Sequence, residues 1–519
     1  MVQITENIVM DYFLELVDQD EVDFLVGKPE EKKCVKELIE ELKETDEIHD
    51  KIQAAKKLWK MLFEVSMVHI DSDKQGYDEL FKYFDEFVTF EELIFASDPF
   101  YRDHTLHSLW VYFIGEYLYN KPEFSFLFKD FYRNLKTAKL ASEFFKKLEA
   151  PNIFSNLYVL LERIGEILDY EDSIRCVIAL THDLGYPLKK IAKINKSIGK
   201  ILPYFSISEF REFNFQFENV QQFYIENLLE LISFNMHFEV ELGDFSYDER
   251  QLVLEITTKL ENLLSSIYNL EEPNEELFKE IKDDLSNVSG KEADILRRIW
   301  TVKAAMQKDV SSILRYSNDF EQYRHGIMSS YMLMKTLNAF SNIQIAYSDP
   351  SEVPITNLDI STVHSKLQIL KAMSDHTSTG FQIRDINNYS EALILFDEIE
   401  EFSRISRANQ FRQFVNEFCK TAVDVKDGYL NIDFIFDNED VADLNPEIAF
   451  VDKCKKFLSI FDVANLSEDI KLRFRSIGKL SHNSNVYEIQ IARNHVKVLI
   501  NDEEQNVSEY LKTKDVFHC

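Results

Sequence analysis

Residues that interrupt helices are rare in this sequence. Its 519 residues include 12 glycines and 10 prolines, well below the average usage of roughly 7% and 5%. Between them run long stretches rich in Leu, Glu, Lys and Ile, and over residues 30–65 apolar positions recur every three or four residues. That spacing is typical of amphipathic helices. The sequence therefore predicts a mainly α-helical protein.

The last hundred residues follow a different pattern. Four short stretches alternate apolar and polar residues: "GYLNIDFIFDN", "LRFRSIGKL", "VYEIQIAR" and "HVKVLIN". A period of two predicts β-strands, and the segment "PEIAFVDKCKKFLSIFDV" between the first two stretches predicts a helix. We expect a small α+β domain over residues 425–519, in which the helix covers one face of an antiparallel sheet.

Composition divides the remainder of the chain. Residues 1–95 alternate acidic and apolar positions at helical spacing and predict an N-terminal helical region whose charges face solvent. Residues 96–415 contain helices that are apolar on nearly every side, as buried helices are, and we expect them to form one domain. Within it, residues 200–315 are interpreted as a helical insertion that forms a lid, a dimer face or a partner surface.

Charge and cysteine content exclude several classes of protein. A net charge of −33 disfavours nucleic acid as a partner, because the chain repels polyanions. The five cysteines are scattered and form no CxxC pair, so neither a disulfide framework nor a zinc ribbon is expected. The N-terminus is acidic and lacks the apolar run of a signal peptide or membrane span. We expect a soluble, cytoplasmic protein without membrane association.

The apolar helices carry residues that bind metals. His104 and His107 are three residues apart and share a helix face, and His182 and Asp183 end the next apolar helix. Later helices carry His325, His376 and Asp397. Imidazole and carboxylate together suit Mn, Fe, Ni, Co or Zn, and the absence of cysteine argues against a thiolate site.

Each of these residues also has a structural interpretation. A single buried histidine is most often a satisfied core residue. Asp397 lies among Leu, Ile and Phe residues, and a carboxylate there needs a cation or hydrogen bonds. Arg404 is one candidate partner. The ordered recurrence of His, His-Asp, His, His and Asp, each on an apolar helix, favours a shared metal site.

This order resembles the HD-domain metal-dependent phosphohydrolases, an all-helical superfamily. The matching stretches span about residues 98–410: "HSLWVYFIG", "THDLGYP", "RHGIMSSYML", "AMSDHTS" and "ALILFDEIEEFSR". The resemblance implies an HD-type helical bundle that binds one or two divalent transition metals. One ion would be held by His107, His182, Asp183 and Asp397. His325 and His376 match members that hold a second ion, with Asp183 bridging. His104 fits the pattern less well than His107.

The resemblance also implies a reaction. Metal-bound hydroxide would cleave a phosphate ester or anhydride of a small substrate such as a nucleotide, with Asp183 as a catalytic residue. Lys189 is the candidate for a catalytic cation, and Lys193 and Arg102 are candidates for binding phosphate oxygens. Many members carry a lysine two residues after the His-Asp pair, where this sequence has Gly185. A solvated basic face is the alternative for these lysines.

Two other functions stay open. The chain can instead be a regulatory or scaffolding module that binds a nucleotide and partner proteins through its flanking regions. It can also be a nuclease whose partner supplies a basic surface. Both of these functions are compatible with a homo-oligomer or a protein partner. In the hydrolase, His325 and His376 can contact the substrate if only one ion is bound.

Overall fold

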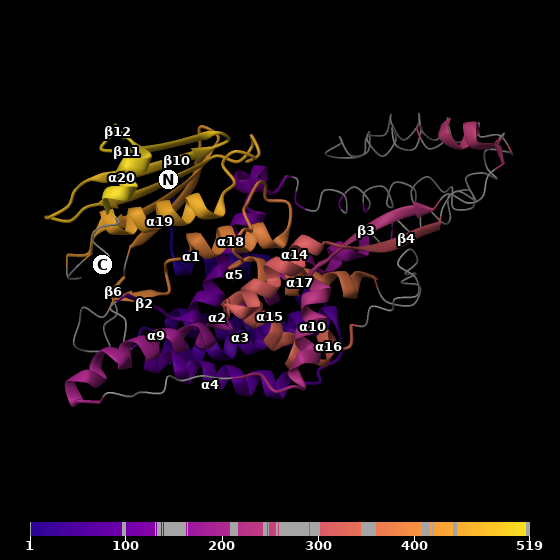
Figure 1. Ribbon diagram of the computed structural model, residues 1–519, viewed down its shortest axis with the longest axis horizontal. Helices are drawn as coiled ribbons and strands as arrows, with labels where there is room; N and C mark the ends of the chain where they lie inside the picture. Colours follow the sequence, from indigo (N-terminus) through magenta and orange to yellow (C-terminus); the bar gives the residue numbers. More distant parts are fainter. Residues whose placement is uncertain are drawn as a thin grey trace.

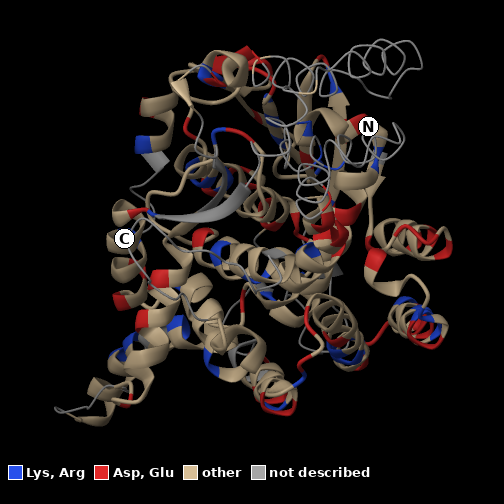
Figure 2. Cartoon of the chain, turned by 90° about the vertical axis from the view of Figure 1, so that its right-hand side faces the viewer, with Lys and Arg blue, Asp and Glu red and all other residues tan. Residues whose placement is uncertain are grey.

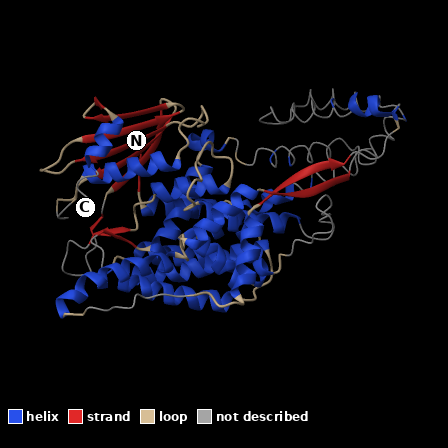
Figure 3. Cartoon of the chain, viewed as in Figure 1, coloured by secondary structure: helices blue, strands red, loops and turns tan. Residues whose placement is uncertain are grey.

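The protein is mainly helical, as its composition predicts (Figures 1 and 3). The computed structural model describes residues 2–95, 100–129, 165–207, 216–241, 249–255, 301–343, 360–406, 419–439 and 444–514, together with positions 131, 136, 139, 162, 246, 247, 258, 290, 416 and 417. A helical body forms one layer, a β-sheet lies against one side of it, and a two-stranded arm extends from another side (Figure 3). No described helix has the length and apolar character needed to cross a membrane.

The N-terminal helices pack directly on the helices that follow. They are α1 (Glu6–Asp18), α2 (Pro29–Glu44), α3 (Ile48–Ile70) and α4 (Tyr77–Phe95). The buried Trp59 of α3 donates a hydrogen bond from Nε1 to the carbonyl of Leu180 at 2.7 Å. Figure 2 shows Lys and Arg interspersed with Asp and Glu along the helices of the chain, and on α2 the exposed Lys33 and Glu37 form such a pair. Residues 1–95 therefore form part of the wall around the central helices.

The central helices supply the candidate site. They are α5 (His104–Asn120), α8 (Glu171–Thr181), α9 (Tyr186–Ile201), α10 (Gln221–Ile232), α14 (Val310–Glu321), α15 (His325–Thr336), α16 (Asn338–Ser341), α17 (Ile360–Asp375) and α18 (Tyr389–Ile399). Short 3-10 helices span Asp23–Leu25, Pro122–Phe128, Glu166–Tyr170 and Leu202–Phe205. α5 is buried from His104 to Leu118, as predicted for a helix that is apolar on nearly every side. The other helices pack around it.

The predicted helical insertion contains two strands. β3 (Phe234–Glu241) and β4 (Thr301–Lys308) pair antiparallel from Phe234↔Lys308 to Glu241↔Thr301 and form the arm (Figure 1). The expectation of helix was wrong for these two stretches. Cross-strand pairing between segments some sixty residues apart outweighed the local helical preference. Much of residues 242–300 lies outside the described residues.

The C-terminal domain is built on a mixed sheet. Its strands are β7 (Lys420–Lys426), β8 (Tyr429–Phe436), β9 (Leu472–Gly478), β10 (Val486–Ala492), β11 (His495–Ile500) and β12 (Glu503–Gln505). Its helices are α19 (Pro446–Ile460) and α20 (Val507–Lys514). β8 to β11 are the four predicted strands and α19 is the predicted helix. β1 (Val2–Ile4) from the N-terminus joins the edge at β7.

The expectation of a purely antiparallel sheet was wrong at one pair. Among the described residues the strand order is β1-β7-β8-β9-β10-β11-β12, and β8 and β9 run parallel. α19 connects them, and a parallel pair requires such a crossover. β2 (Phe100–Arg102), β5 (Arg404–Ser406) and β6 (Asn416–Glu417) form a separate small sheet beside α5.

Candidate metal centre

Asp183 lies at the centre of a group of imidazoles. It follows α8, at the turn into α9, and is buried. Its Oδ2 is 3.6 Å from Nε2 of His107 and 3.4 Å from Nε2 of His182. Its Oδ1 is 3.1 Å from Nε2 of His325 and 3.7 Å from Nε2 of His376. The two oxygens of one carboxylate thus face different pairs of histidines.

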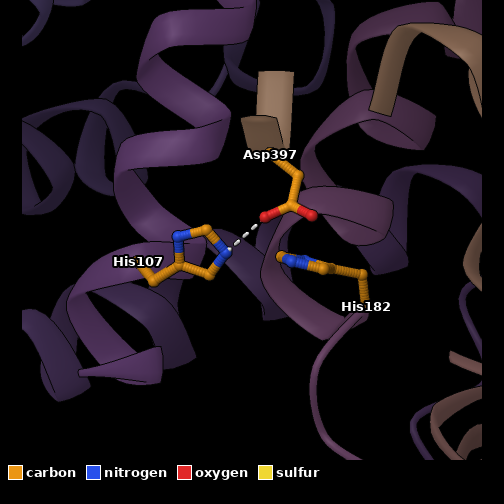
Figure 4. A group of neighbouring side chains, drawn as sticks. All are labelled: His107, His182 and Asp397. Carbon is orange, nitrogen blue, oxygen red and sulfur yellow. Dashed lines mark ion pairs between the residues drawn. The ribbon is translucent and has the colours of Figure 1, made fainter. Parts of the chain in front are cut away.

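Asp397 of α18 completes the group on the Oδ2 side. Its Oδ1 lies 3.0 Å from Nε2 of His107, and its other oxygen points toward His182 (Figure 4). One ligand atom from each of His107, His182 and Asp397 lies within 4.8 Å of the others, and the same holds for His182, Asp183 and His376. All six residues predicted to bind metal therefore meet in one cluster, in which His325 and Asp397 are partly exposed and the other four are buried. These His and Asp groups can hold a metal ion.

Hydrogen bonds fix the orientation of the imidazoles. Nδ1 of His107 is 2.5 Å from Oε2 of Glu400. Nδ1 of His182 bonds to the carbonyl of Ala179 at 2.8 Å. Nδ1 of His376 bonds to the carbonyl of Met373 at 2.6 Å. In metal sites such partners on Nδ1 hold the ring so that Nε2 faces the ion.

The hydrogen bonding of the Nε2 atoms indicates whether the cluster suits a metal ion. Nε2 of His182 and Nε2 of His376 are buried and make no hydrogen bond. A buried polar atom left without a partner costs free energy, and both atoms point at Asp183. Coordination would satisfy them. The residues present therefore fit a hard or borderline divalent ion bound by nitrogen and oxygen ligands.

His104 also points at Asp183. Its Nε2 is 3.9 Å from Oδ2 of Asp183, and its Nδ1 is 2.6 Å from Oε2 of the buried Glu91. The ring lies 3.8 Å from the ring of Tyr186, centroid to centroid. The sequence favours His107 over His104, and the structure brings both to the same carboxylate. Sequence analysis did not single out Glu91 or Glu400, because acidic residues are common in this chain. Glu91 lies in none of the matching stretches, and Glu400 is one of four acidic residues in "ALILFDEIEEFSR".

The protonation states of His182, His325 and Asp183 suit metal ligands. Burial lowers the pKa of His182 to about 4 and the pKa of His325 to about 3, so both imidazoles are neutral at pH 7. Burial alone would raise the pKa of Asp183, but the interaction with His182 and a hydrogen bond from His325 hold it well below the ordinary value. Neutral imidazole and ionised carboxylate are the forms that bind metal.

His107 differs from the other imidazoles. Burial and the nearby Arg102 charge lower its pKa, but Asp397 and Glu400 outweigh them and raise its pKa to about 9. The ring is thus held between two carboxylates, with Asp397 on Nε2 and Glu400 on Nδ1.

Two glycines allow the helices to meet at the cluster. A Cβ on Gly185 would lie 2.3 Å from the carbonyl oxygen of His325. A Cβ on Gly326 would lie 2.2 Å from the carbonyl oxygen of Met373 and 2.7 Å from Nδ1 of His376. All three distances are too short for any side chain. Gly185 is therefore required by packing against His325.

Arg102 contacts protein carboxylates beside the cluster. Its Nη1 is 3.2 Å from Oδ1 of Asp397, and its Nη2 is 3.2 Å from Oε1 of Glu401. Nη2 also donates to the carbonyl of Glu400 at 2.9 Å. Arg404 pairs with Glu401 instead, so the partner of Asp397 is Arg102. Arg102, which the sequence analysis proposed as a ligand of phosphate oxygens, is therefore paired with carboxylates of the protein.

The predicted lysines lie on α9. Lys189 Nζ is 3.5 Å from Nδ1 of His325, at the edge of the cluster. Burial lowers the pKa of the Lys189 ammonium, and the charges of Lys456 and Arg324 lower it further. Lys193 lies one turn later on α9, and its side chain lies outside the described residues. Lys456 of α19 was not predicted, because nothing in its local sequence links it to a site more than 50 residues away.

A comparison of the chain with protein-family models, curated proteins and solved structures found no match.

Proposed function

We propose that this protein is a metal-dependent phosphohydrolase with a two-ion centre. One ion would be held by His107, His182, Asp183 and Asp397, and the other by Asp183, His325 and His376. The observation that carries the proposal is that the two carboxylate oxygens of Asp183 face different pairs of histidine Nε2 atoms, at distances of 3.1–3.7 Å. A carboxylate that bridges two ions needs that arrangement.

The pair of ions would supply Lewis-acid charge to a phosphoryl oxygen and a nucleophile derived from water. The chain's own residues hold the ligands in place. Glu400, Ala179 and Met373 fix the imidazole rings through Nδ1, and the buried surroundings strengthen charge interactions at the centre. We assign Lys189 to a phosphoryl oxygen of the substrate, because its ammonium lies next to His325.

Cations around the cluster support a phosphorylated substrate. Lys189 comes from α9, Arg324 precedes α15, and Lys456 comes from α19. The charges of Arg324 and Lys456 reach Lys189. Lys456 is paired with Glu398, but in a chain with a net charge of −33 the cations of Lys189 and Arg324 at one site favour an anionic ligand. A nucleotide is the small phosphorylated substrate that we propose.

Metal analysis combined with turnover tests the proposal. We expect about two transition-metal ions per chain by elemental mass spectrometry after loading with Mn²⁺, and hydrolysis of bis(p-nitrophenyl) phosphate that Asp183→Ala abolishes. Asp462→Ala is the matched control, since Asp462 forms its ion pair with the exposed Arg384. Circular dichroism checks that the variants are folded.

The outcomes separate the candidate functions. Two ions with turnover support the hydrolase. Nucleotide binding by the metal-loaded protein without turnover of any phosphate ester would favour the regulatory module. A protein that binds no ion after loading with manganese, iron and zinc would contradict the two-ion centre.

A further inference from the structure

An ion-pair cluster joins α18 to the C-terminal domain. The last residues of α18 and the two that follow it form the acidic sequence Asp-Glu-Ile-Glu-Glu, residues 397–401. Lys453 of α19 lies against it, with Nζ 3.0 Å from Oε2 of Glu398 and 3.2 Å from Oε1 of Glu401. Lys456, one turn on, lies 3.1 Å from Oε1 of Glu398. Two lysines of the C-terminal domain thus neutralise carboxylates at the end of the helix that carries Asp397.

The cluster continues to the candidate metal centre. Glu401 contacts both Lys453 and Arg102 through the same Oε1 atom, at 3.2 Å each. Arg102 in turn contacts Asp397 at 3.2 Å. Glu401 is 1% exposed and Lys453 is 13% exposed, so solvent screens these pairs weakly. A continuous path of charge contacts runs from α19 through Glu401 and Arg102 to Asp397.

Lys453 also caps α18. Its Nζ donates to the main-chain carbonyl of Glu398 at 2.7 Å, next to Asp397. The last carbonyls of a helix have no intrahelical partner, and a cation near them interacts favourably with the helix dipole. A lysine of the C-terminal domain therefore supplies the hydrogen bond that a carbonyl at the end of α18 lacks. Because this carbonyl belongs to the residue after Asp397, the contact also fixes the backbone from which the Asp397 side chain projects.

The docking of α19 is fixed at its other end as well. The amide of Ile383, in the segment before α18, donates to the carbonyl of Ile460 at 2.6 Å. The amide of Asp462 donates back to the carbonyl of Ile383 at 3.0 Å. α19 is thus held by main-chain hydrogen bonds beyond its C-terminus and by Lys453 and Lys456 on its side. Its position relative to α18 is defined at two separate places.

We propose that the C-terminal domain positions the metal centre: Lys453 holds Asp397 in its ligand geometry through Glu401 and Arg102. None of the described residues of the C-terminal domain belongs to the His/Asp cluster, and Lys453 is a positioning residue that acts through other groups. The inference rests on the two-ion centre proposed above. Without Lys453, the carboxylates of Glu398 and Glu401 lose a shared cation, Arg102 is drawn toward Glu401, and its contact with Asp397 weakens.

The test is a titration of the full-length chain, freed of metal by a chelator, with Mn²⁺ by isothermal calorimetry. We expect Lys453→Gln to weaken the ion bound at Asp397 roughly tenfold to a hundredfold, the range seen when a group that orients a ligand is removed. The ion at His325 and His376 should bind as in the wild type. Lys497→Gln is the matched control, because Lys497 forms an exposed ion pair with Glu504 in the same domain.

Two further variants separate positioning from general stability. Lys453→Arg keeps the charge and should restore most of the affinity. In an Asp397→Asn background, which lacks the ion at Asp397, Lys453→Gln should leave the affinity for the remaining ion unchanged. A loss of both ions to the same extent, with a lowered thermal midpoint, would mean that Lys453 only stabilises the fold and would overturn the inference.

The remaining outcomes distinguish the two proposals. If the wild type binds two ions and Lys453→Gln binds both with unchanged affinity, the positioning role is wrong and the centre stands. If the wild type binds no ion, both proposals are wrong.

Discussion

The two halves of the His/Asp cluster are built differently. The half that contains His107 and Asp397 is oriented by charged side chains, with Glu400 on His107 and Arg102 on Asp397. The half that contains His325 and His376 has the carbonyl of Met373 on His376 and an ammonium beside His325. His107 is fully buried, whereas His325 is 12% exposed.

We expect the two halves to differ in how tightly they bind an ion and in how close they lie to the substrate. Charged partners in a buried setting fix geometry strongly, so the Asp397 half is expected to bind its ion more tightly. The His325 half adjoins Lys189 and the surrounding cations, so the substrate is expected to enter there. Asp183 belongs to both halves, and it is the one residue whose loss should not discriminate between them.

The largest effect is expected when ligands are removed. Asp183→Asn should abolish binding of both ions, because its two oxygens serve different halves. Asp397→Asn and His376→Gln should each remove one ion and leave the other. Elemental mass spectrometry on dialysed protein gives the stoichiometry. Loss of both ions in either Asp397→Asn or His376→Gln would mean that the halves do not bind separately.

The next effect concerns the group that orients His107. Glu400→Gln should weaken the ion at the Asp397 half by roughly tenfold to a hundredfold, because Nδ1 of His107 loses its charged partner. Calorimetric titration with Mn²⁺ measures the change. Glu391→Gln alters another buried glutamate of α18 and should leave both affinities unaltered. An unchanged affinity in Glu400→Gln would show that the carboxylate is dispensable for orientation.

A backbone contact provides the corresponding test of the other half. Gly326→Ala would place a Cβ within 2.7 Å of Nδ1 of His376 and closer still to the carbonyl of Met373. We expect a loss of about 1–3 kcal/mol in the free energy of unfolding, as for other overpacked sites. The ion at His376 should also bind more weakly than the ion at Asp397. Gly199→Ala is the control, since a Cβ there meets no atom within 4 Å. Equal stability of the two alanine variants would contradict the packing at Gly326.

The smallest expected effect is a pH dependence of the free energy of unfolding that does not involve the candidate metal centre. Burial raises the pKa of Glu391, at the start of α18, to about 7. The native protein therefore holds this proton to a higher pH than the unfolded chain, and its stability falls as pH rises from about 4.5 to 7. Glu391→Gln removes that titration. Between pH 5 and pH 8, the free energy of unfolding of the variant should therefore fall by about 1–2 kcal/mol less than that of the wild type.

Denaturant unfolding at the two pH values measures the difference. Glu398→Gln is the comparison on the same helix, because Glu398 is paired with Lys453 and Lys456. A wild type and Glu391→Gln variant with parallel pH profiles would show that Glu391 does not titrate in this range.

The residues of the candidate centre could be predicted because each lies in a local pattern. His107, His182 and Asp397 stand out as polar groups within apolar helices, and the alternation of β8 to β11 marks the strands of the C-terminal domain. The same reasoning failed for β3 and β4, whose pairing joins distant segments. It also missed β1, because three residues at the N-terminus carry too short a pattern to indicate which strand they join.

By itself, the sequence determined the mainly helical class and the α+β character of the C-terminal domain, since periodicity is a local property of the chain. It also pointed to the six residues of the cluster, through their place on apolar helices and through the resemblance of their order to that of a known family. Only the tertiary structure decided which atoms meet: Asp183 between two pairs of imidazoles, Glu400 on His107, and Lys453 against Glu401. Glu400 and His107 are separated by 293 residues. No local pattern encodes a contact across such a distance, because it depends on how the helices pack.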